Sequence, residues 1–316
     1  MPADIFRDWY ARSLGGQDDW PAARPMLAHY TSIETLQSML KSNELWFSNP
    51  LRMNDLEELE FGLTKGIDAF RTSSHLRRVF DDEDYSKFQK SIDFLRLNYQ
   101  RKNLIDTYVS CWSEQSGDDV NGRLSMWRGY GAQGSGAAVV IDTSRIELVE
   151  PSPLVIAKVR YGTEDERLRM AMNLAESFAQ AVATARPSGG ELVRAAGHAV
   201  DRIILFGLLT KHVGFEEERE WRVVYLVDHD PSGLLSDCLS YSVGSSGIET
   251  KLRFPFTPRA GVNADNVSWS NLVHRIILGP SHASELAQQS AHRMLTHLDK
   301  ADLIPRTVAS SIPLRA

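Results

Sequence analysis

The sequence predicts an α+β fold built from mixed, mainly antiparallel sheets with flanking helices. Its 316 residues are 42% hydrophobic and 24% charged, which is typical of a globular chain that buries a sizeable core. Patterns typical of strands and of helices both occur, but they do not alternate regularly as they do in βαβ proteins. A mixed sheet is therefore expected instead of a doubly wound parallel one.

Two segments are predicted, an N-terminal helical extension at 1–25 and a single α+β domain at 26–316. Residues 1–13 have an amphipathic pattern and precede a Gly-Gly break. Strands are expected at 26–30, 44–49, 104–112, 137–142, 154–161, 220–227, 251–256, 273–280 and near 303–309. Helices are expected at 33–41, 56–70, 74–102 with a break at the acidic run 81–84, 123–130 and 284–300, and two more in a helical insertion at about 164–212.

Charge and cysteine content exclude several classes of protein. A net charge of −6 argues against a non-specific binder of the phosphate backbone. The two cysteines, Cys111 and Cys238, are far apart, so neither a disulfide framework nor a zinc site is expected. The N-terminus lacks a secretory signal pattern, and the longest apolar stretch, 203–209, is far shorter than the roughly 20 residues of a membrane span. We expect a cytoplasmic protein without a membrane partner.

Three common site motifs are also missing from the sequence. The glycine-rich stretch at 129–136 precedes a predicted strand, whereas a phosphate-binding loop follows a strand and opens a helix, so a tight turn is expected there. The nine histidines are scattered without metal-ligand spacing, and no metal is expected. A Gly-x-Ser-x-Gly nucleophile motif does not occur.

The segment "EREWR" at 218–222 concentrates charge at a predicted strand. If the strand begins near Glu218, alternation places Glu218, Glu220 and Arg222 on one face. Unpaired charges are costly to bury, so such a face calls for an explanation. One interpretation is a solvated edge strand, a second is a structural Glu–Arg pair, and a third is a functional site.

Several short blocks follow one another along the chain: "HYTS" at 29–32, "LWFSNP" at 45–50, Asn54, Asp55 and Glu58, "CWSE" at 111–114, Trp127 and Tyr130, the strand ending at Asp142, Tyr161, "EREWR" at 218–222 and "RIILGP" at 275–280. In these blocks and their order the sequence resembles a bacterial family known as domain of unknown function 2971. One departure is Leu56, where the family usually has proline after Asn-Asp. Asn54 and Asp55 are interpreted as a helix cap.

The order His…Tyr…Glu is similar to that of ADP-ribosyltransferases, which implies an ADP-ribosyltransferase-like fold and NAD as the substrate. The resemblance implies that His29 binds a ribose, although His29 taken alone also fits a core histidine. It implies an aromatic platform for nicotinamide at Tyr130 or Trp127. A carboxylate beside the ribose would stabilise oxocarbenium charge, and Glu220 is the first choice with Glu218 as its partner. The implied NAD-binding residues are His29, Tyr30, Thr31, Trp127, Tyr130 and Arg222.

The function implied is an NAD-dependent ADP-ribosyltransferase, a toxin or phage-defence effector that modifies an unknown protein or nucleic-acid acceptor. An antitoxin or a defence-system protein is an expected partner. The alternatives are an NAD glycohydrolase and a non-catalytic nucleotide- or partner-binding module. The transferase hypothesis predicts that His29, Tyr130 and Glu220 converge on one cleft.

Overall fold

The computed structural model describes residues 5–13, 19–53, 56–98, 105–149, 152–244 and 247–314. The predicted cap at Asn54 and Asp55 lies outside the described residues. The chain divides into two compact units. We call residues 1–22, 50–107 and 157–216 the helical unit, and residues 23–49, 108–156 and 217–316 the sheet unit. The helices of 164–212 thus group with two earlier segments of the chain instead of standing alone.

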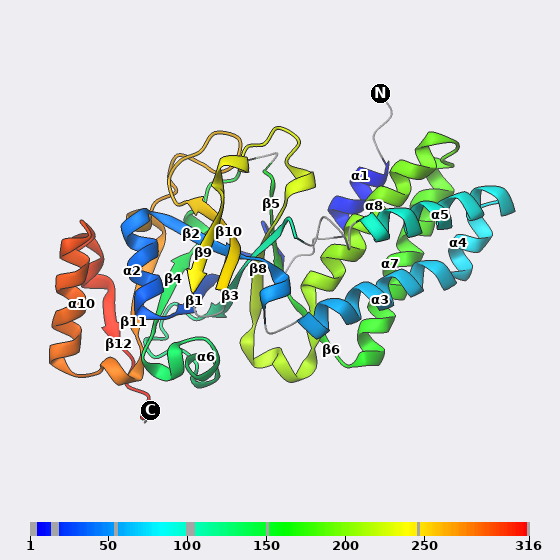
Figure 1. The fold of residues 1–316 in the computed structure, drawn as a ribbon. Coiled ribbons are helices and arrows are strands. Elements are labelled where there is room, and N and C mark those ends of the chain that lie inside the picture. The colour runs from blue at the N-terminus through cyan, green and yellow to red at the C-terminus, as the bar shows by residue number, and fades with distance from the viewer. Residues whose placement is uncertain are drawn as a thin grey trace. The chain divides into compact units, whose positions relative to one another are not determined.

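The helical unit consists mainly of long helices (Figure 1). They are α1 (Ile5–Arg12), α3 (Leu56–Thr72), α4 (Ser74–Val79), α5 (Asp82–Asn98), α7 (Glu164–Ala185) and α8 (Gly190–Leu209). A small parallel sheet joins β6 (Arg160–Gly162) to β7 (Thr210–His212). The acidic run predicted as a break between helices supplies the first turn of α5, where carboxylates stabilise the positive end of the helix dipole.

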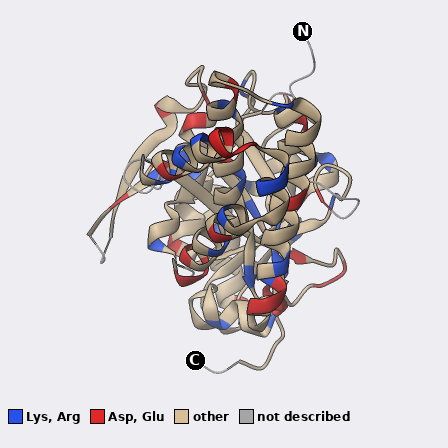
Figure 2. Ribbon diagram, turned by 90° about the vertical axis from the view of Figure 1, so that its right-hand side faces the viewer, with Lys and Arg blue, Asp and Glu red and all other residues tan. Residues whose placement is uncertain are grey.

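Phe178 lies at the centre of the helical unit. Its ring contacts those of Phe6, Trp9, Phe70 and Phe88 at centroid distances of 4.8–5.5 Å, which joins α1, α3 and α5 to α7. Helices α3 and α8 also approach closely, because a Cβ atom at Gly62 would lie 2.5 Å from the Cα atom of Gly207. Figure 2 shows acidic and basic residues interspersed along these helices, as is typical of solvated faces.

The sheet unit contains a ten-stranded, mixed sheet. Its strands are β1 (Met26–Thr31), β2 (Glu44–Ser48), β3 (Thr107–Gln115), β4 (Ala137–Asp142), β5 (Leu154–Lys158), β8 (Glu220–Leu226), β9 (Leu239–Gly244), β10 (Gly247–Pro255), β11 (Val273–Leu278) and β12 (Thr307–Ala309). The order is β12-β11-β4-β1-β3-β2-β10-β9, and β8 pairs with both β3 and β5. The helices of this unit are α2 (Ile33–Ser42), α6 (Leu124–Gly129), α9 (Trp269–Leu272) and α10 (Glu285–His297).

Neighbouring strands of this sheet are mostly antiparallel, and the pair β11–β12 is parallel. The prediction of an α+β fold with a mixed, mostly antiparallel sheet is therefore confirmed. Strand β9 was not expected, because its sequence "LSYSVG" mixes serine with scattered apolar residues. It forms by pairing along β10, so tertiary context supplies what local pattern does not.

One side of the sheet is covered by α6. Ala28 and Tyr30 from β1 form a buried cluster with Met126 and Trp127 from α6 and with Ile277 of β11. The turn that follows α6 lies against the end of β1, where a Cβ atom at Gly136 would lie 2.1 Å from the carbonyl oxygen of Thr31. Glycine is therefore required at that close approach, which accounts for the predicted glycine-rich turn.

Candidate functional site

Three neighbouring strands of the sheet carry most of the predicted site residues. Leu27 of β1 lies opposite Glu114 of β3, and the Glu114 backbone N–H donates to the carbonyl oxygen of Arg219 at 2.9 Å. A strand residue directs its backbone polar groups to one side, so β3 lies between β1 and the start of β8. The "HYTS", "CWSE" and "EREWR" blocks are thus side by side.

Glu218 and Tyr130 form a partly exposed pair. The Tyr130 hydroxyl donates to Oε1 of Glu218 at 3.0 Å, and the Tyr130 side chain is 38% exposed. Arg123 contacts the backbone of this pair, because its Nη1 donates to Ser113 Oγ at 2.6 Å and to the carbonyl oxygen of Glu218 at 3.4 Å. We call Ser113, Arg123, Tyr130 and Glu218 the Tyr130–Glu218 cluster.

Arg123 is the cationic member of this cluster. Burial, followed by the nearby Arg219 charge, lowers the pKa of the Arg123 guanidinium. Its Nη2 donates to the carbonyl oxygen of Glu114. Arg123 therefore links the end of β3 to the backbone of Glu218 through hydrogen bonds to both carbonyl oxygens, and these bonds help to position the Glu218 side chain.

Glu220 and Arg222 form a buried ion pair. Nε and Nη2 of Arg222 donate to the two carboxylate oxygens of Glu220 at 2.7 Å and 3.1 Å. Glu220 is 5% exposed and Arg222 is 4% exposed. This bidentate geometry matches the interpretation of the segment as a structural Glu–Arg pair. Glu220 is consequently less accessible than Glu218.

Glu218 does not belong to the strand that carries Glu220. The strand begins at Glu220, as the predicted strand at 220–227 does, and Glu218 ends the 3₁₀ helix Val213–Glu218, so the alternative of a strand that starts near Glu218 is not found. Between them Arg219 has a φ of 43°, a left-handed conformation that is uncommon for a residue with a side chain. Alternation along one strand therefore relates Glu220 to Arg222 but does not place Glu218.

Tyr30 and Trp127 lie in the hydrophobic core. Trp127 is fully buried, and its ring meets the Tyr30 ring edge-on at a centroid distance of 4.9 Å. The Trp127 indole donates to the carbonyl oxygen of Asn121 at 2.8 Å. The Tyr30 hydroxyl accepts from the Arg123 backbone N–H at 3.0 Å, and burial raises the pKa of Tyr30 to about 12. In this arrangement neighbouring side chains cover both rings.

His29 and Thr31 point to the other side of the sheet, because they alternate with Tyr30 along β1. Nδ1 of His29 lies 2.9 Å from the carbonyl oxygen of Cys111, and its ring lies 5.2 Å from that of Trp112. Because a carbonyl only accepts, Nδ1 carries the proton. Burial lowers the pKa of His29, which favours the neutral ring.

The structure therefore separates the predicted residues into three groups, one of which is the buried pair of Tyr30 and Trp127. Tyr130, Glu218, Glu220 and Arg222 lie along the end of β3 and the start of β8. His29 lies on the side of β1 opposite to the one that α6 covers, so the predicted convergence of His29 with Tyr130 is not found. The roles predicted for these residues stay predictions.

Sequence reasoning did not select Arg123 or Ser113. Both lie close to recognised blocks, since Ser113 belongs to "CWSE" and Arg123 precedes Trp127 by four residues. Arg123 is the cation nearest in sequence to the Trp127–Tyr130 block on its N-terminal side, and a search for a partner of the two glutamates would have found it there.

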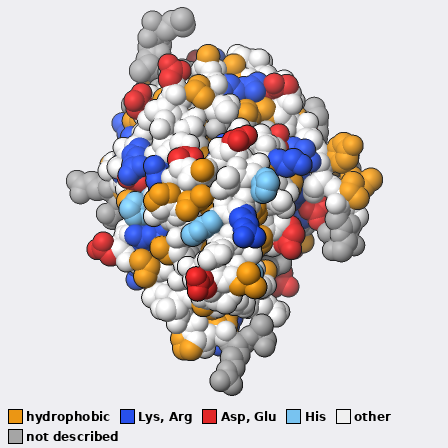
Figure 3. Space-filling view, turned by 90° about the vertical axis from the view of Figure 1, so that its left-hand side faces the viewer, with side chains coloured by type: hydrophobic (Ala, Val, Ile, Leu, Met, Phe, Trp, Pro, Cys, Tyr) orange, Lys and Arg blue, Asp and Glu red, His pale blue; other side chains and the backbone are white. Residues whose placement is uncertain are grey.

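Within the described residues, no group of three or more His, Cys, Asp or Glu side chains is arranged to hold a metal ion. None of the described helices combines the length and the apolar content needed to cross a membrane. On the face in Figure 3, hydrophobic, acidic, basic and histidine side chains are intermixed among the coloured residues.

Residues 126–223 match the model of a family described as Protein of unknown function (DUF2971). The match begins in α6 and ends in β8, so it includes Trp127, Tyr130 and the 218–222 segment. The match supports, over this region, the family predicted from the sequence. No curated protein and no solved structure matches the chain.

Proposed function

We propose that this protein is an ADP-ribosyltransferase that uses NAD as its substrate, with the Tyr130–Glu218 cluster as the reactive site. The observation that carries the proposal is the accessible carboxylate of Glu218, held 3.0 Å from the hydroxyl of a partly exposed tyrosine. An aromatic ring beside a carboxylate suits a ligand that has a planar, cationic base joined to a ribose. Nicotinamide riboside units have this chemistry.

The proposed reaction breaks the bond between the nicotinamide nitrogen and C1′ of its ribose. Nicotinamide leaves with the bonding electron pair, and positive charge develops on the ribose ring. The Glu218 carboxylate stabilises that charge, and the Tyr130 ring lies against the departing base. The acceptor then forms a bond to C1′, and its proton passes to a carboxylate or to solvent. The proposed chemistry requires no metal.

The remaining residues support the reactive pair in this proposal. Arg123 and Ser113 bind the Glu218 carbonyl oxygen, and the Glu220–Arg222 pair anchors the first residues of β8. The strained Arg219 between them is typical of a segment whose conformation serves function. His29 binds the Cys111 carbonyl on the opposite face of the sheet, so the proposed site does not include the ribose-binding role implied for it. Adjacency of the three strands β1, β3 and β8 supports the proposed transferase-like architecture.

Release of nicotinamide from NAD tests the proposal directly. The wild-type protein, Glu218→Gln, Glu220→Gln and Glu217→Gln are incubated with NAD, and free nicotinamide is followed by chromatography. Glu217 is exposed and adjacent in sequence, so its substitution is a matched control for the loss of one charge. We expect release by wild type and Glu217→Gln and a loss of about 100-fold or more in Glu218→Gln.

The two glutamates give different outcomes. If Glu220 is the catalytic carboxylate, as the resemblance to ADP-ribosyltransferases implies, Glu218→Gln retains release while Glu220→Gln loses it without unfolding. If wild type releases no nicotinamide with or without cell lysate, the transferase proposal fails. Radiolabelled NAD in lysate separates transfer from hydrolysis, because label on protein or nucleic acid identifies the acceptor class and free ADP-ribose indicates a glycohydrolase.

A binding module is the second candidate function, and the burial of Glu220 favours it. A carboxylate that already accepts two bonds from Arg222 is poorly placed to act on substrate. In that case NAD binds without nicotinamide release, and Glu218→Gln weakens binding instead of turnover. A toxin or phage-defence role in the cytoplasm, restrained by a partner, belongs to the first candidate. It predicts that expression of the wild type but not of Glu218→Gln slows bacterial growth.

A further inference from the structure

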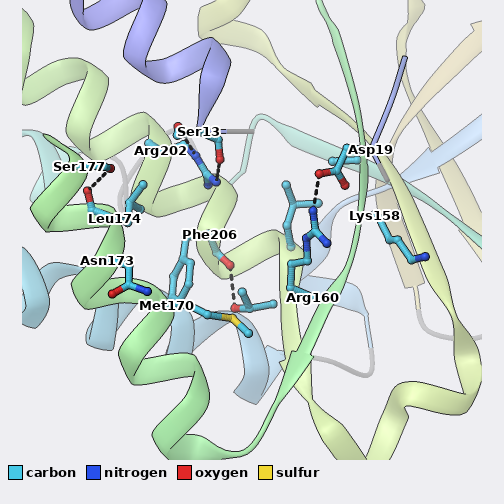
Figure 4. A pocket seen from close by; sticks show the side chains of 13 residues that line it. Ser13, Asp19, Lys158, Arg160, Met170, Asn173, Leu174, Ser177, Arg202 and Phe206 are labelled. Carbon is cyan, nitrogen blue, oxygen red and sulfur yellow. Dashed lines mark hydrogen bonds and ion pairs between the residues drawn. The ribbon is translucent and has the colours of Figure 1, made fainter. Parts of the chain in front are cut away.

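A pocket of about 310 Å³ opens within the helical unit (Figure 4). Its wall is formed by α7, α8, the segment at 157–160 and residues at the end of α1. Its volume is at the lower end of the range of small-molecule sites. All the lining residues belong to one compact unit.

Arg202 is the most unusual of the lining residues. Its Nε donates to Ser13 Oγ at 2.8 Å and its Nη2 donates to the Ser13 carbonyl oxygen, whereas Nη1 is buried and has no hydrogen-bond partner. Burial lowers the pKa of Arg202 to about 10, so the side chain is still cationic at neutral pH. A buried cationic donor without an acceptor is costly and rare, so a negative charge beside the Arg202 guanidinium would be stabilising.

The charges around Arg202 favour an anion. Asp19 is buried and pairs with Arg160, so that carboxylate is already engaged by another cation of the same wall. Figure 4 shows this pair and the bond from Arg202 to Ser13, and it shows the Lys158 ammonium directed away from them. Arg160, Arg202 and Asp19 together carry one net positive charge, and Lys158, which also lines the pocket, adds a second.

The rest of the wall is mostly apolar. Met170, Leu174, Phe206 and Leu209 line it, and the exposed amide of Asn173 adds a polar group from α7. A pocket with an apolar wall and one unsatisfied cationic donor suits a ligand that has an apolar body and a single oxyanion.

We propose that this pocket binds a small organic oxyanion, a carboxylate or a phosphate monoester, whose charged group pairs with the guanidinium of Arg202 at the pocket wall. The apolar body of the ligand lies against Met170 and Phe206. This site is separate from the Tyr130–Glu218 cluster, which belongs to the other unit, so neither proposal depends on the other.

Binding of four matched probes to the full chain tests the proposal by isothermal titration calorimetry. The probes are phenyl phosphate, benzoate, benzyl alcohol and inorganic phosphate. We expect phenyl phosphate or benzoate to bind at least about tenfold more tightly than the two probes that lack either the charge or the ring. The stronger of the first two identifies the oxyanion class.

Variants assign the binding to the pocket. Arg202→Gln is expected to weaken binding about tenfold or more, whereas Arg194→Gln leaves it unchanged. Arg194 lies on the same helix with a mostly exposed side chain, so it is a matched loss of charge. Because Arg202 also holds Ser13, Asn173→Phe serves as a second variant that fills the pocket and keeps the arginine. The proposal is overturned if neither oxyanion binds at millimolar concentration or if both variants bind as wild type does.

Discussion

Trp127 and Tyr130 are three residues apart at the same short helix, yet the structure gives them opposite environments. Trp127 is fully buried against Tyr30, and its indole N–H is bonded to a backbone carbonyl. Tyr130, at the C-terminal end of α6, is 38% exposed and bonded to Glu218. The sequence resemblance proposes both as platforms for nicotinamide, but only Tyr130 presents an accessible ring.

The difference follows from the length of α6. The helix ends at Gly129, and Tyr130 is its C-cap with a non-helical φ of −128° and ψ of −18°, so the Tyr130 side chain does not continue the helix face that carries Trp127. Residues that lie against the sheet contribute to stability, and residues at the helix end are available for binding. Substitutions on each side of this divide should therefore have distinct effects.

The largest expected effect is on stability, at Trp127. Trp127→Ala removes a fully buried aromatic side chain from the cluster with Ala28, Tyr30 and Met126, and we expect a loss of about 3–5 kcal/mol in the free energy of unfolding. Chemical denaturation measures it. Trp46→Ala on β2, where the side chain is partly exposed, is the control and should cost much less. An equal loss in both variants would contradict a purely structural role for Trp127.

Glu220, like Trp127 and unlike Tyr130, is expected to contribute mainly to the free energy of unfolding. Glu220→Gln replaces a carboxylate that accepts two bonds from Arg222, and charge-assisted bonds of this kind contribute about 1.5–3 kcal/mol. Glu218→Gln, at a partly exposed position, should lower the free energy of unfolding by less than about 1 kcal/mol. Denaturation of both variants in parallel compares them. Equal stabilities would show that the pair contributes nothing and would return Glu220 to the list of reactive groups.

The strands and helices could largely be predicted because local patterns specify them. The apolar run at 137–142 forms a fully buried strand, and the Thr163 capping box starts α7 where the helical pattern begins. The site was less predictable. Pairing of Tyr130 with Glu218 depends on the 3₁₀ helix before Arg219, and period-two alternation cannot indicate such a break. The grouping of 164–212 with 50–107 likewise depends on contacts between residues distant in sequence.

His29, on the side of β1 opposite to Tyr30, should make the free energy of unfolding depend on pH. Its folded-state pKa lies below the ordinary value near 6.5, so below about pH 6.5 the unfolded chain takes up a proton that the folded chain resists. Stability from this residue is therefore complete above pH 6.5 and falls as the pH drops towards the folded pKa. We expect His29→Gln to flatten the fall in unfolding free energy between pH 7.5 and 5.5, whereas His297→Gln, at an exposed position, should not. Parallel profiles for wild type and His29→Gln would contradict this assignment.

The smallest effect on stability is expected at Tyr130. Substitutions there should change nicotinamide release much more than they change the free energy of unfolding. Tyr130→Phe keeps the ring and removes one exposed hydrogen bond, so the free energy of unfolding should change by no more than about 0.5 kcal/mol. Nicotinamide release should fall about tenfold, because the Glu218 carboxylate loses the group that orients it. Tyr130→Ala also removes the ring and should reduce release further through weaker NAD binding. If both variants retain wild-type release, Tyr130 is only a surface residue that happens to lie beside Glu218, and its accessibility has no bearing on catalysis.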